Sequence, residues 1–167
     1  MRIQHLTILN TREAKRLHEQ LEQQYGYKGK MPYAFLQSNK DKVYIIHKDV
    51  DQVELQTLRV DTLGLYFMTL HYPHEKGKKT SEFQLRLSIE GSQLIGPQAT
   101  KNVLDLTKEQ TKAWFRGEDL EIDPSCTGFQ IIRHQSDYLG CGKASSGKLY
   151  NYLPKTRRIV PEHTPNE

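Results

Sequence analysis

The sequence predicts an α+β protein in which a small α/β module is followed by a β-rich unit that curls into a closed or half-closed barrel. Residues 14–25 place apolar side chains at helical spacing between strand-like runs. Residues 83–89 alternate apolar and polar side chains. Residues 128–160 contain short β-rich runs, which are separated by glycine turns and followed by a cluster of cations. These patterns place a helix in the first half of the chain and a barrel in the second.

The boundary between the two units is predicted in residues 71–80, which have no apolar periodicity and have the composition of an exposed loop or linker. We therefore predict an α/β module at residues 1–79, a barrel at residues 80–162 and a frayed tail at residues 163–167. His71 and His74 lie three positions apart in the linker, a spacing that can bind a metal on a helix. Because no cysteine or further histidine is nearby, we expect two solvent-exposed histidines and no metal site.

The composition indicates a globular chain with a polar surface. The chain has 167 residues, of which 36% are hydrophobic and 26% charged, and this length suffices to bury a core. The formal net charge of +4 favours a polyanionic partner over an acidic one. No apolar run approaches the roughly 20 residues that span a bilayer, and residues 1–10 lack the order of a secretory signal. We therefore expect a cytoplasmic protein without a membrane partner.

The elements of the first half follow from capping and periodicity. A strand is predicted at residues 3–9, and Asn10 with Glu13 forms the pattern of a capping box at the start of a helix that Gly26 ends. Two further strands, at residues 33–36 and 43–47, are joined by a polar turn and read as a hairpin. A short helix is expected at residues 49–55 and an apolar strand at residues 64–70. The basic face of the first helix, Arg12, Lys15 and Arg16, is expected to be solvated.

The second half predicts a series of short strands and one helix. The alternation at residues 83–89 indicates a strand with one buried face, followed by a turn at residues 94–97 and a strand at residues 102–106. Thr107 with Gln110 forms a second capping box, for a helix that runs through Phe115 and stops at Gly117. Trp114, near its end, is expected in the core rather than on the surface as a stacking platform. Strands at residues 128–134, 138–143 and 149–153 complete the barrel.

The strongest enzyme-like signal is the segment DPSCTG at residues 123–128. It resembles the D-x-P-C-S-G motif in which RNA cytosine-C5 methyltransferases carry their nucleophilic cysteine. In the motif the proline directly precedes the cysteine, whereas here one residue separates Pro124 from Cys126. The sequence also has neither the βαβ unit nor the glycine-rich turn that would bind S-adenosylmethionine. We therefore predict that Cys126 is not catalytic, with a cysteine-dependent enzyme as the competing hypothesis.

Other catalytic and metal motifs are absent from the sequence. It has no P-loop, no Ser-His-Asp set and no clustered carboxylates. Cys126 and Cys141 do not form a C-x-x-C pattern, so we expect reduced thiols and no zinc site. The sequence thus predicts a protein that is not an enzyme and that holds no metal or cofactor.

Four runs carry a resemblance to a known family: RLSIEGSQLIGP at residues 86–97, WFRGEDLE at residues 114–121, GFQIIRHQSDYLGCGK at residues 128–143 and NYLPKTRRI at residues 151–159. They resemble the PUA domain, named for pseudouridine synthases and archaeosine transglycosylases. The greatest likeness is to the PUA-like carboxyl-terminal region of Sun-type, RsmF-like rRNA cytosine-C5 methyltransferases and their archaeal stand-alone relatives. The resemblance implies a PUA-like β pseudobarrel that binds structured RNA behind a small α/β pre-PUA module, which residues 1–79 fit by layout.

The methyltransferase domain of that family is not represented in this sequence, so the resemblance implies RNA binding and no methylation. The positions that it marks as RNA-binding are Arg86, Gly91, Gln93, Gly96, Arg116, Gly117, Gly140, Gly142, Lys143, Lys155, Arg157 and Arg158. The cations among them can neutralise phosphates, and the glycines let another backbone approach. Gln93 or His134 can hydrogen-bond a base edge or a 2′-hydroxyl. The competing interpretation of Arg157 and Arg158 is a salt-bridged rim of the barrel.

We therefore predict a non-catalytic RNA-binding protein that acts in rRNA or tRNA modification or in ribosome biogenesis. Its expected partners are structured RNA and an RNA-modifying enzyme or ribosome-assembly factor. The alternative hypothesis is a protein–protein adaptor in ribosome assembly or translation, for which RNA contact is incidental.

Overall fold

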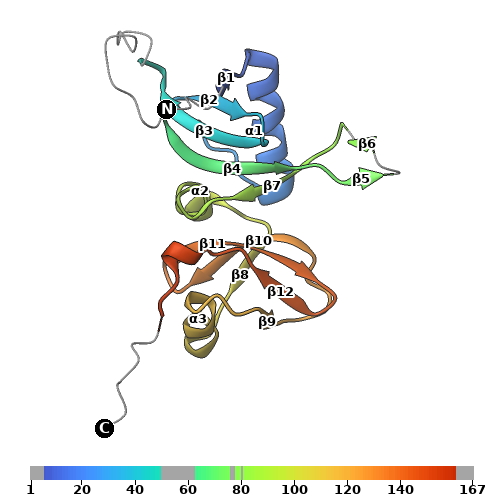
Figure 1. The fold of residues 1–167 in the computed structure, drawn as a ribbon, viewed down its shortest axis with the longest axis vertical. Coiled ribbons are helices and arrows are strands. Elements are labelled where there is room, and N and C mark those ends of the chain that lie inside the picture. Colours follow the sequence, from blue (N-terminus) through green and yellow to red (C-terminus); the bar gives the residue numbers. More distant parts are fainter. Residues whose placement is uncertain (1–5, 50–62, 76–77, 80, 161–167) are drawn as a thin grey trace.

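A computed structural model describes residues 6–49, 63–75, 78–79 and 81–160. The chain forms two stacked five-stranded sheets with a helix between them (Figure 1). The first sheet has the strand order β1-β2-β3-β4-β7, and the second, which curls into a half-barrel, has the order β8-β10-β11-β12-β9. The predicted α+β fold class is confirmed. Among the described residues, no helix is long and apolar enough to cross a membrane.

The first sheet begins with β1 (Leu6–Ile8), after which α1 (Thr11–Tyr25) crosses one face of the sheet. The predicted capping box is present: the Glu13 amide donates to Asn10 Oδ1 (3.0 Å), and the Asn10 amide donates to Glu13 Oε2 (2.8 Å). Gly26 ends the helix in the left-handed conformation, at φ 66°. The apolar stripe of α1 is buried on the sheet, as its periodicity predicts.

The rest of the first sheet is antiparallel. The predicted hairpin is formed by β2 (Tyr33–Ser38) and β3 (Lys42–His47), and β4 (Leu65–His71) pairs with β3. The short helix expected at residues 49–55 lies outside the described residues, apart from its first position. The predicted linker forms the end of β4 and the small hairpin of β5 (His74–Glu75) and β6 (Lys78–Lys79), which projects from the body in Figure 1.

The strand predicted at residues 83–89 exists as β7 (Gln84–Leu87), but it completes the first sheet instead of opening the barrel. It pairs with β4, with Leu85 opposite Leu70 and Leu87 opposite Met68. β7 belongs to the first sheet because its apolar face is buried there: Leu85 and Leu87 pack under α1. The Tyr25 hydroxyl of α1 donates to Leu85 O (2.6 Å). The projecting hairpin returns the chain to the same sheet.

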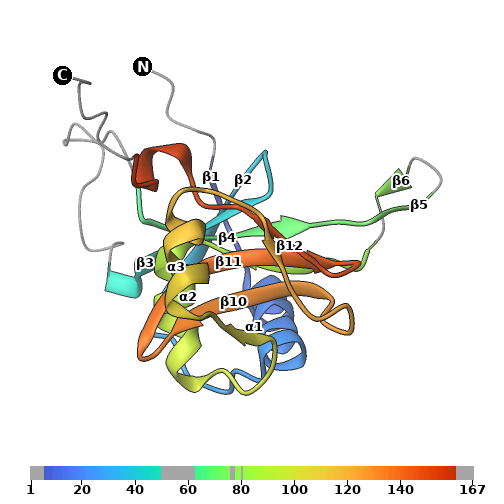
Figure 2. The same ribbon diagram turned by 90° about the horizontal axis from the view of Figure 1, so that it is seen from below.

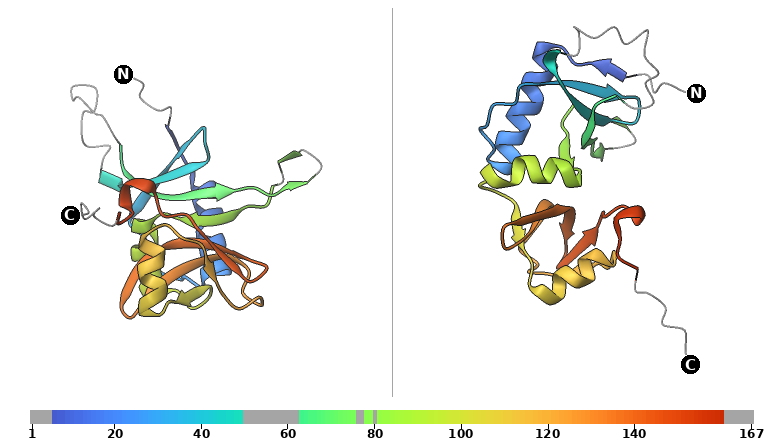
Figure 3. Two further views of the ribbon diagram at one scale, coloured as in Figure 1. Left: turned by 60° about the horizontal axis from the view of Figure 1, so that its bottom comes forward. Right: turned by 90° about the vertical axis from the view of Figure 1, so that its left-hand side faces the viewer.

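Two short helical segments then lead into the barrel. Residues 89–95, for which the sequence predicted only a turn at the end, form α2 (Ile89–Ile95), and η3 (Gly96–Gln98) follows. Ser88 caps α2 because its hydroxyl accepts from the Gly91 amide (2.9 Å). α2 packs against β4 on one side and β11 on the other, so it lies between the two sheets (Figure 3, right). We propose that the boundary between the two units lies after η3 rather than at residue 80.

The barrel contains β8 (Val103–Asp105), α3 (Lys108–Phe115) and β9 (Leu120–Glu121), followed by β10 (Gly128–His134), β11 (Asp137–Ser145) and β12 (Lys148–Asn151). The three carboxyl-terminal strands and the second capping box, at Thr107 and Gln110, agree with the sequence prediction. Trp114 of α3 is fully buried in the barrel core, also as predicted. After β12, the chain runs through η4 (Lys155–Arg157), and α2, α3 and η4 gather on one side of the molecule (Figure 2).

One hydrophobic cluster spans the two units, beside the smaller cluster around Trp114 inside the barrel. Leu85 and Ile95 from the first unit pack in the same cluster as Phe129, Ile131 and Cys141 from the barrel. Because apolar burial is the main stabilising term, neither unit is expected to keep its stability without the other. This continuity also fixes the position of the strands that meet at the junction, where the candidate site lies.

Candidate nucleic-acid interface

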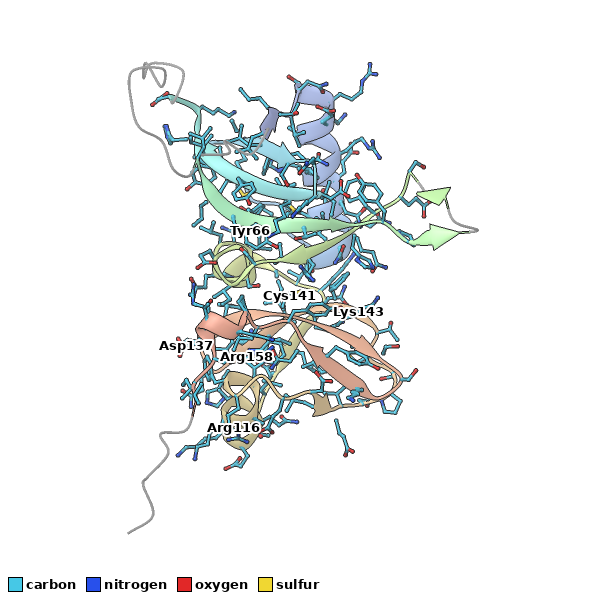
Figure 4. The ribbon with its side chains drawn as sticks, viewed as in Figure 1. Tyr66, Arg116, Asp137, Cys141, Lys143 and Arg158 are labelled. Carbon is cyan, nitrogen blue, oxygen red and sulfur yellow. The ribbon has the colours of Figure 1, made fainter. Side chains whose placement is uncertain are left out.

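A cleft of about 340 Å³ opens where the first sheet meets the barrel. We call it the junction cleft. It is lined by residues from β3, β4, β7, α2, α3 and β11, and by the segment after β12, residues 152–158, which we call the carboxyl-terminal strap. The lining residues are Lys42, Tyr66, Arg86, Leu87, Ser88, Ile89, Glu90, Trp114, Gly140, Cys141, Tyr152, Leu153, Pro154, Thr156 and Arg157. In Figure 4, Tyr66 and Cys141 lie on either side of the junction.

Strand alternation brings cations to this cleft. On β7, Leu85 and Leu87 face the core, so Arg86 between them points to the opposite face of the sheet. The pairing register then aligns Arg86 with Thr69 of β4, and Thr69 with Lys42 of β3. Two positive charges therefore lie in one row across three strands, on the face away from α1.

Aromatic rings pair with these cations. The Arg86 guanidinium lies 4.6 Å from the ring centroid of Tyr152, on the strap, and Lys42 Nζ lies 5.3 Å from the ring centroid of Tyr66. Arg157 of η4 donates to Glu90 of α2 (Nη1 to Oε1, 3.0 Å) and so holds the strap against the first unit. The cleft thus combines three cations with one carboxylate and two tyrosines.

The cation–aromatic contacts continue along the barrel. The Tyr152 ring lies 6.2 Å from the ring of Phe129, and Lys143 Nζ lies 5.5 Å from the same Phe129 ring. Phe129 is buried, so it supports its neighbours and offers no free face to a base. Tyr152 is 40% exposed and is the accessible ring of this row.

Of the positions that the resemblance marked, the structure places Arg86, Gly140 and Arg157 in the junction cleft. Lys155 is exposed beside them on η4, and Lys143 lies farther along the barrel face. Three of these five residues therefore line the cleft, and the other two lie on elements that contribute to its lining.

Three marked glycines serve the packing of the chain itself. A Cβ on Gly91 would collide with the Phe67 carbonyl oxygen, and one on Gly96 would collide with the Tyr138 ring. A Cβ on Gly142 would lie 3.1 Å from Trp114 Cη2, inside the barrel core. All three are buried, so the close approach that they allow is by protein atoms and not by RNA.

The remaining marked residues lie outside the cleft. Arg116 forms a two-pronged ion pair with Glu118 (2.6 and 3.3 Å), and Arg158 packs over Gly117 and donates to Leu153 O (3.1 Å). Arg116 and Arg158 are labelled in Figure 4. Two further positions lie elsewhere: Gln93 is exposed beside an apolar groove of the first sheet, and His134 Nδ1 lies 2.8 Å from Leu106 O.

Lys42, Tyr66, Tyr152 and Trp114 line the cleft but were not among the marked positions. For Lys42 and Tyr66, the available signal was their position on strands that each have one buried face. That signal tells which face is exposed, but it cannot tell what lies opposite. Tyr152 falls within the run that carries the resemblance, between Asn151 and Leu153, but the resemblance marks cations, glycines and one glutamine as RNA-binding and no aromatic ring.

Cys126 is poorly suited to nucleophilic catalysis. Partial burial and, after it, the negative charge of Asp123 raise the pKa of the Cys126 thiol above its ordinary value. Reactive cysteines have a lowered pKa because the thiolate is the nucleophile. Cys141 is fully buried, and burial raises its pKa to about 11. Both thiols are therefore protonated at neutral pH.

Comparison with known proteins matches residues 101–159 to the family model described as the methyltransferase RsmF PUA domain. The chain is 26% identical over 148 residues to the ribosomal RNA small subunit methyltransferase F of Aeromonas salmonicida (strain A449), an alignment that covers 88% of this chain and 28% of the relative. It is 34% identical over 55 residues to the protein of the same name from Vibrio vulnificus (strain YJ016), which covers 33% of this chain and 12% of that relative. The chain therefore spans little more than a quarter of the first relative, and the predicted resemblance to the RsmF-type PUA domain is confirmed for residues 101–159.

Proposed function

We propose that this protein binds structured RNA through the junction cleft and the carboxyl-terminal strap, and that it does so in rRNA modification or ribosome biogenesis. The observation that carries the proposal is the convergence of Lys42, Arg86 and Arg157 on one cleft beside an RsmF-type PUA domain. Each cation comes from a different element, so their meeting depends on the tertiary fold.

The charge of the cleft supports an anionic ligand. Its three cations face one carboxylate, that of Glu90, and Lys155 adds a fourth cation on the exposed side of η4. Phosphates that approach the strap compete with Glu90 for Arg157 and with the Tyr152 ring for Arg86. Both existing contacts are partly exposed and therefore weak, so they are readily exchanged.

The side chains of the junction cleft and the strap favour RNA with accessible loops or ends. The face combines a cationic row with exposed Tyr152, and proteins recognise single-stranded RNA segments by stacking on such rings. We propose a binding role without catalysis for these residues. Because these relatives are named as ribosomal RNA small subunit methyltransferases, small-subunit rRNA is the first RNA to test.

The proposal is tested by measuring the affinity of the full chain for fragments of small-subunit rRNA over a range of salt concentrations. Four phosphate contacts, by Lys42, Arg86, Lys155 and Arg157, are expected to give a slope of log K against log salt of about −3. A slope near zero with measurable binding would contradict a phosphate-contacting site. An adaptor with incidental RNA contact predicts a protein complex that survives nuclease and high salt, with no RNA affinity of this kind.

A further inference from the structure

Trp114, a core residue that also borders the junction cleft, carries a hydrogen-bond donor that the phosphate contacts do not use. Trp114 lines the cleft and is 0% exposed, and its Nε1–H has no hydrogen-bond partner among the described residues. Buried polar groups are normally paired, because leaving one unpaired costs its full desolvation energy. An unpaired indole N–H beside a cleft is therefore a candidate contact for a ligand.

Gly140 leaves space above this indole. Its φ of +130° lies in a region that residues with a side chain rarely adopt. A Cβ at this position would lie 3.5 Å from Ile89 Cγ1 and 3.9 Å from Trp114 Cζ2, inside the cleft lining. The missing side chain thus leaves the cleft wider beside the Trp114 ring.

The dimensions and the walls of the cleft suit a nucleotide. Its volume of about 340 Å³ lies at the lower end of small-ligand sites, which hold about 300–1,000 Å³. The Arg86 guanidinium lies over the Tyr152 ring at its side, 4.6 Å from the ring centroid, and Arg157 also lines the cleft from the strap. Bases that leave the RNA stack are bound on such aromatic or guanidinium planes.

We propose that the junction cleft binds one unstacked nucleotide of the RNA, with its phosphate held by Arg86 and Arg157 and an acceptor on its base paired with Trp114 Nε1–H. This inference rests on the proposed function and names the part of the RNA that enters the cleft. Because the indole has no exposed surface in the free protein, the base reaches the donor by displacing the side chains that cover it.

Trp114 provides a direct readout, because it is the single tryptophan of the chain. The full chain is titrated with the four homopentameric ribonucleotides, and Trp114 fluorescence is followed together with the anisotropy of an end-labelled pentamer. We expect a saturable change in Trp114 emission for at least one pentamer, at the concentrations at which anisotropy rises. A fully base-paired RNA stem, which offers no unstacked base, is expected to raise anisotropy without changing the emission.

Substitutions separate the base contact from general RNA binding. Trp114→Phe keeps an aromatic ring but removes the N–H. The loss of this hydrogen bond is expected to weaken pentamer binding about five- to tenfold, while stem binding stays unchanged. Tyr152→Ala is expected to weaken pentamer binding about tenfold through lost stacking. Tyr150→Ala is the matched control, because Tyr150 of β12 is 42% exposed, about as much as Tyr152, and does not line the cleft.

The outcomes distinguish this inference from the proposed function. Pentamer binding by anisotropy with unchanged Trp114 emission, or equal pentamer affinity of the wild type and the Tyr152→Ala variant, would overturn the nucleotide site and leave RNA binding in place. Absence of binding to both pentamers and stems would overturn the proposed function and the nucleotide site together.

Discussion

Replacing Arg86, Lys155 and Arg157 together by alanine is expected to weaken binding of structured RNA by on the order of a hundredfold at about 0.1 M salt. Each of the three side chains neutralises one phosphate in the proposed interface. Their loss should also reduce the magnitude of the salt slope by about 2 to 3, since each phosphate contact contributes about 0.7–0.9. The measurement is a salt series of binding curves with an rRNA fragment. Arg158 is left unchanged because it packs over Gly117 and bonds Leu153 O.

The matched control removes the same number of charges elsewhere. Arg12, Lys15 and Lys28 are exposed on or beside α1, which covers the other face of the first sheet. Their joint replacement by alanine is expected to change RNA affinity by no more than about threefold, through net charge alone. Equal losses in the two triple variants would show that RNA responds to overall charge and not to the junction cleft.

Gly91→Ala is expected to destabilise the protein by about 2 kcal/mol net, because overlap with a fixed backbone carbonyl lies at the upper end of the about 1–3 kcal/mol that small-to-large changes in a packed site cost. The added Cβ would collide with the Phe67 carbonyl oxygen, which is held in place because it accepts from the Ser88 amide (2.9 Å) and the Ser88 hydroxyl (3.0 Å). The better helix propensity of alanine offsets about 1 kcal/mol of the collision. At about 2–4 °C per kcal/mol for a chain of this size, thermal unfolding should shift downward by roughly 4–8 °C.

Gln93→Ala is the control for this substitution, since Gln93 is exposed on the same helix. A surface change of this kind should alter stability by less than about 0.5 kcal/mol. If Gly91→Ala unfolds at the same temperature as the wild type, α2 does not hold the two sheets together as described. Retained RNA binding by folded Gly91→Ala would support the structural assignment of this glycine.

The elements that local chemistry specifies were predictable from the sequence. The ends of α1 and α3 follow from capping boxes whose hydrogen bonds join residues three positions apart. The strands β10, β11 and β12 follow from alternation between turns. In each case the information lies within a few residues of the element that it specifies.

Non-local pairing was not predictable in the same way. The alternation of β7 predicts that Leu85 and Leu87 are buried. It does not predict that β7 pairs with β4 instead of with a strand of the barrel. Glycine gives a similar ambiguity, since the residue type permits close approach by any backbone or side chain. In this chain Gly91 and Gly96 are approached by Phe67 and Tyr138.

The candidate site was predicted in part for the same reason. The resemblance covers mainly the second half of the chain, and it led to Arg86 and Arg157. Lys42 and Tyr66 come from the first sheet and reach the cleft only through the register of β3, β4 and β7. A site at the junction of two units therefore needs the tertiary structure before it can be defined.

We propose that RNA lies on the junction cleft and the carboxyl-terminal strap. The decisive measurement is to irradiate the wild-type chain with a bound rRNA fragment and to map the cross-linked peptides by mass spectrometry. We expect cross-links in the peptides that contain Tyr152 and Tyr66, and their loss when unlabelled RNA competes. Cross-links confined to α1, which covers the opposite face of the first sheet, with none at Tyr152 or Tyr66, would contradict this placement of the RNA.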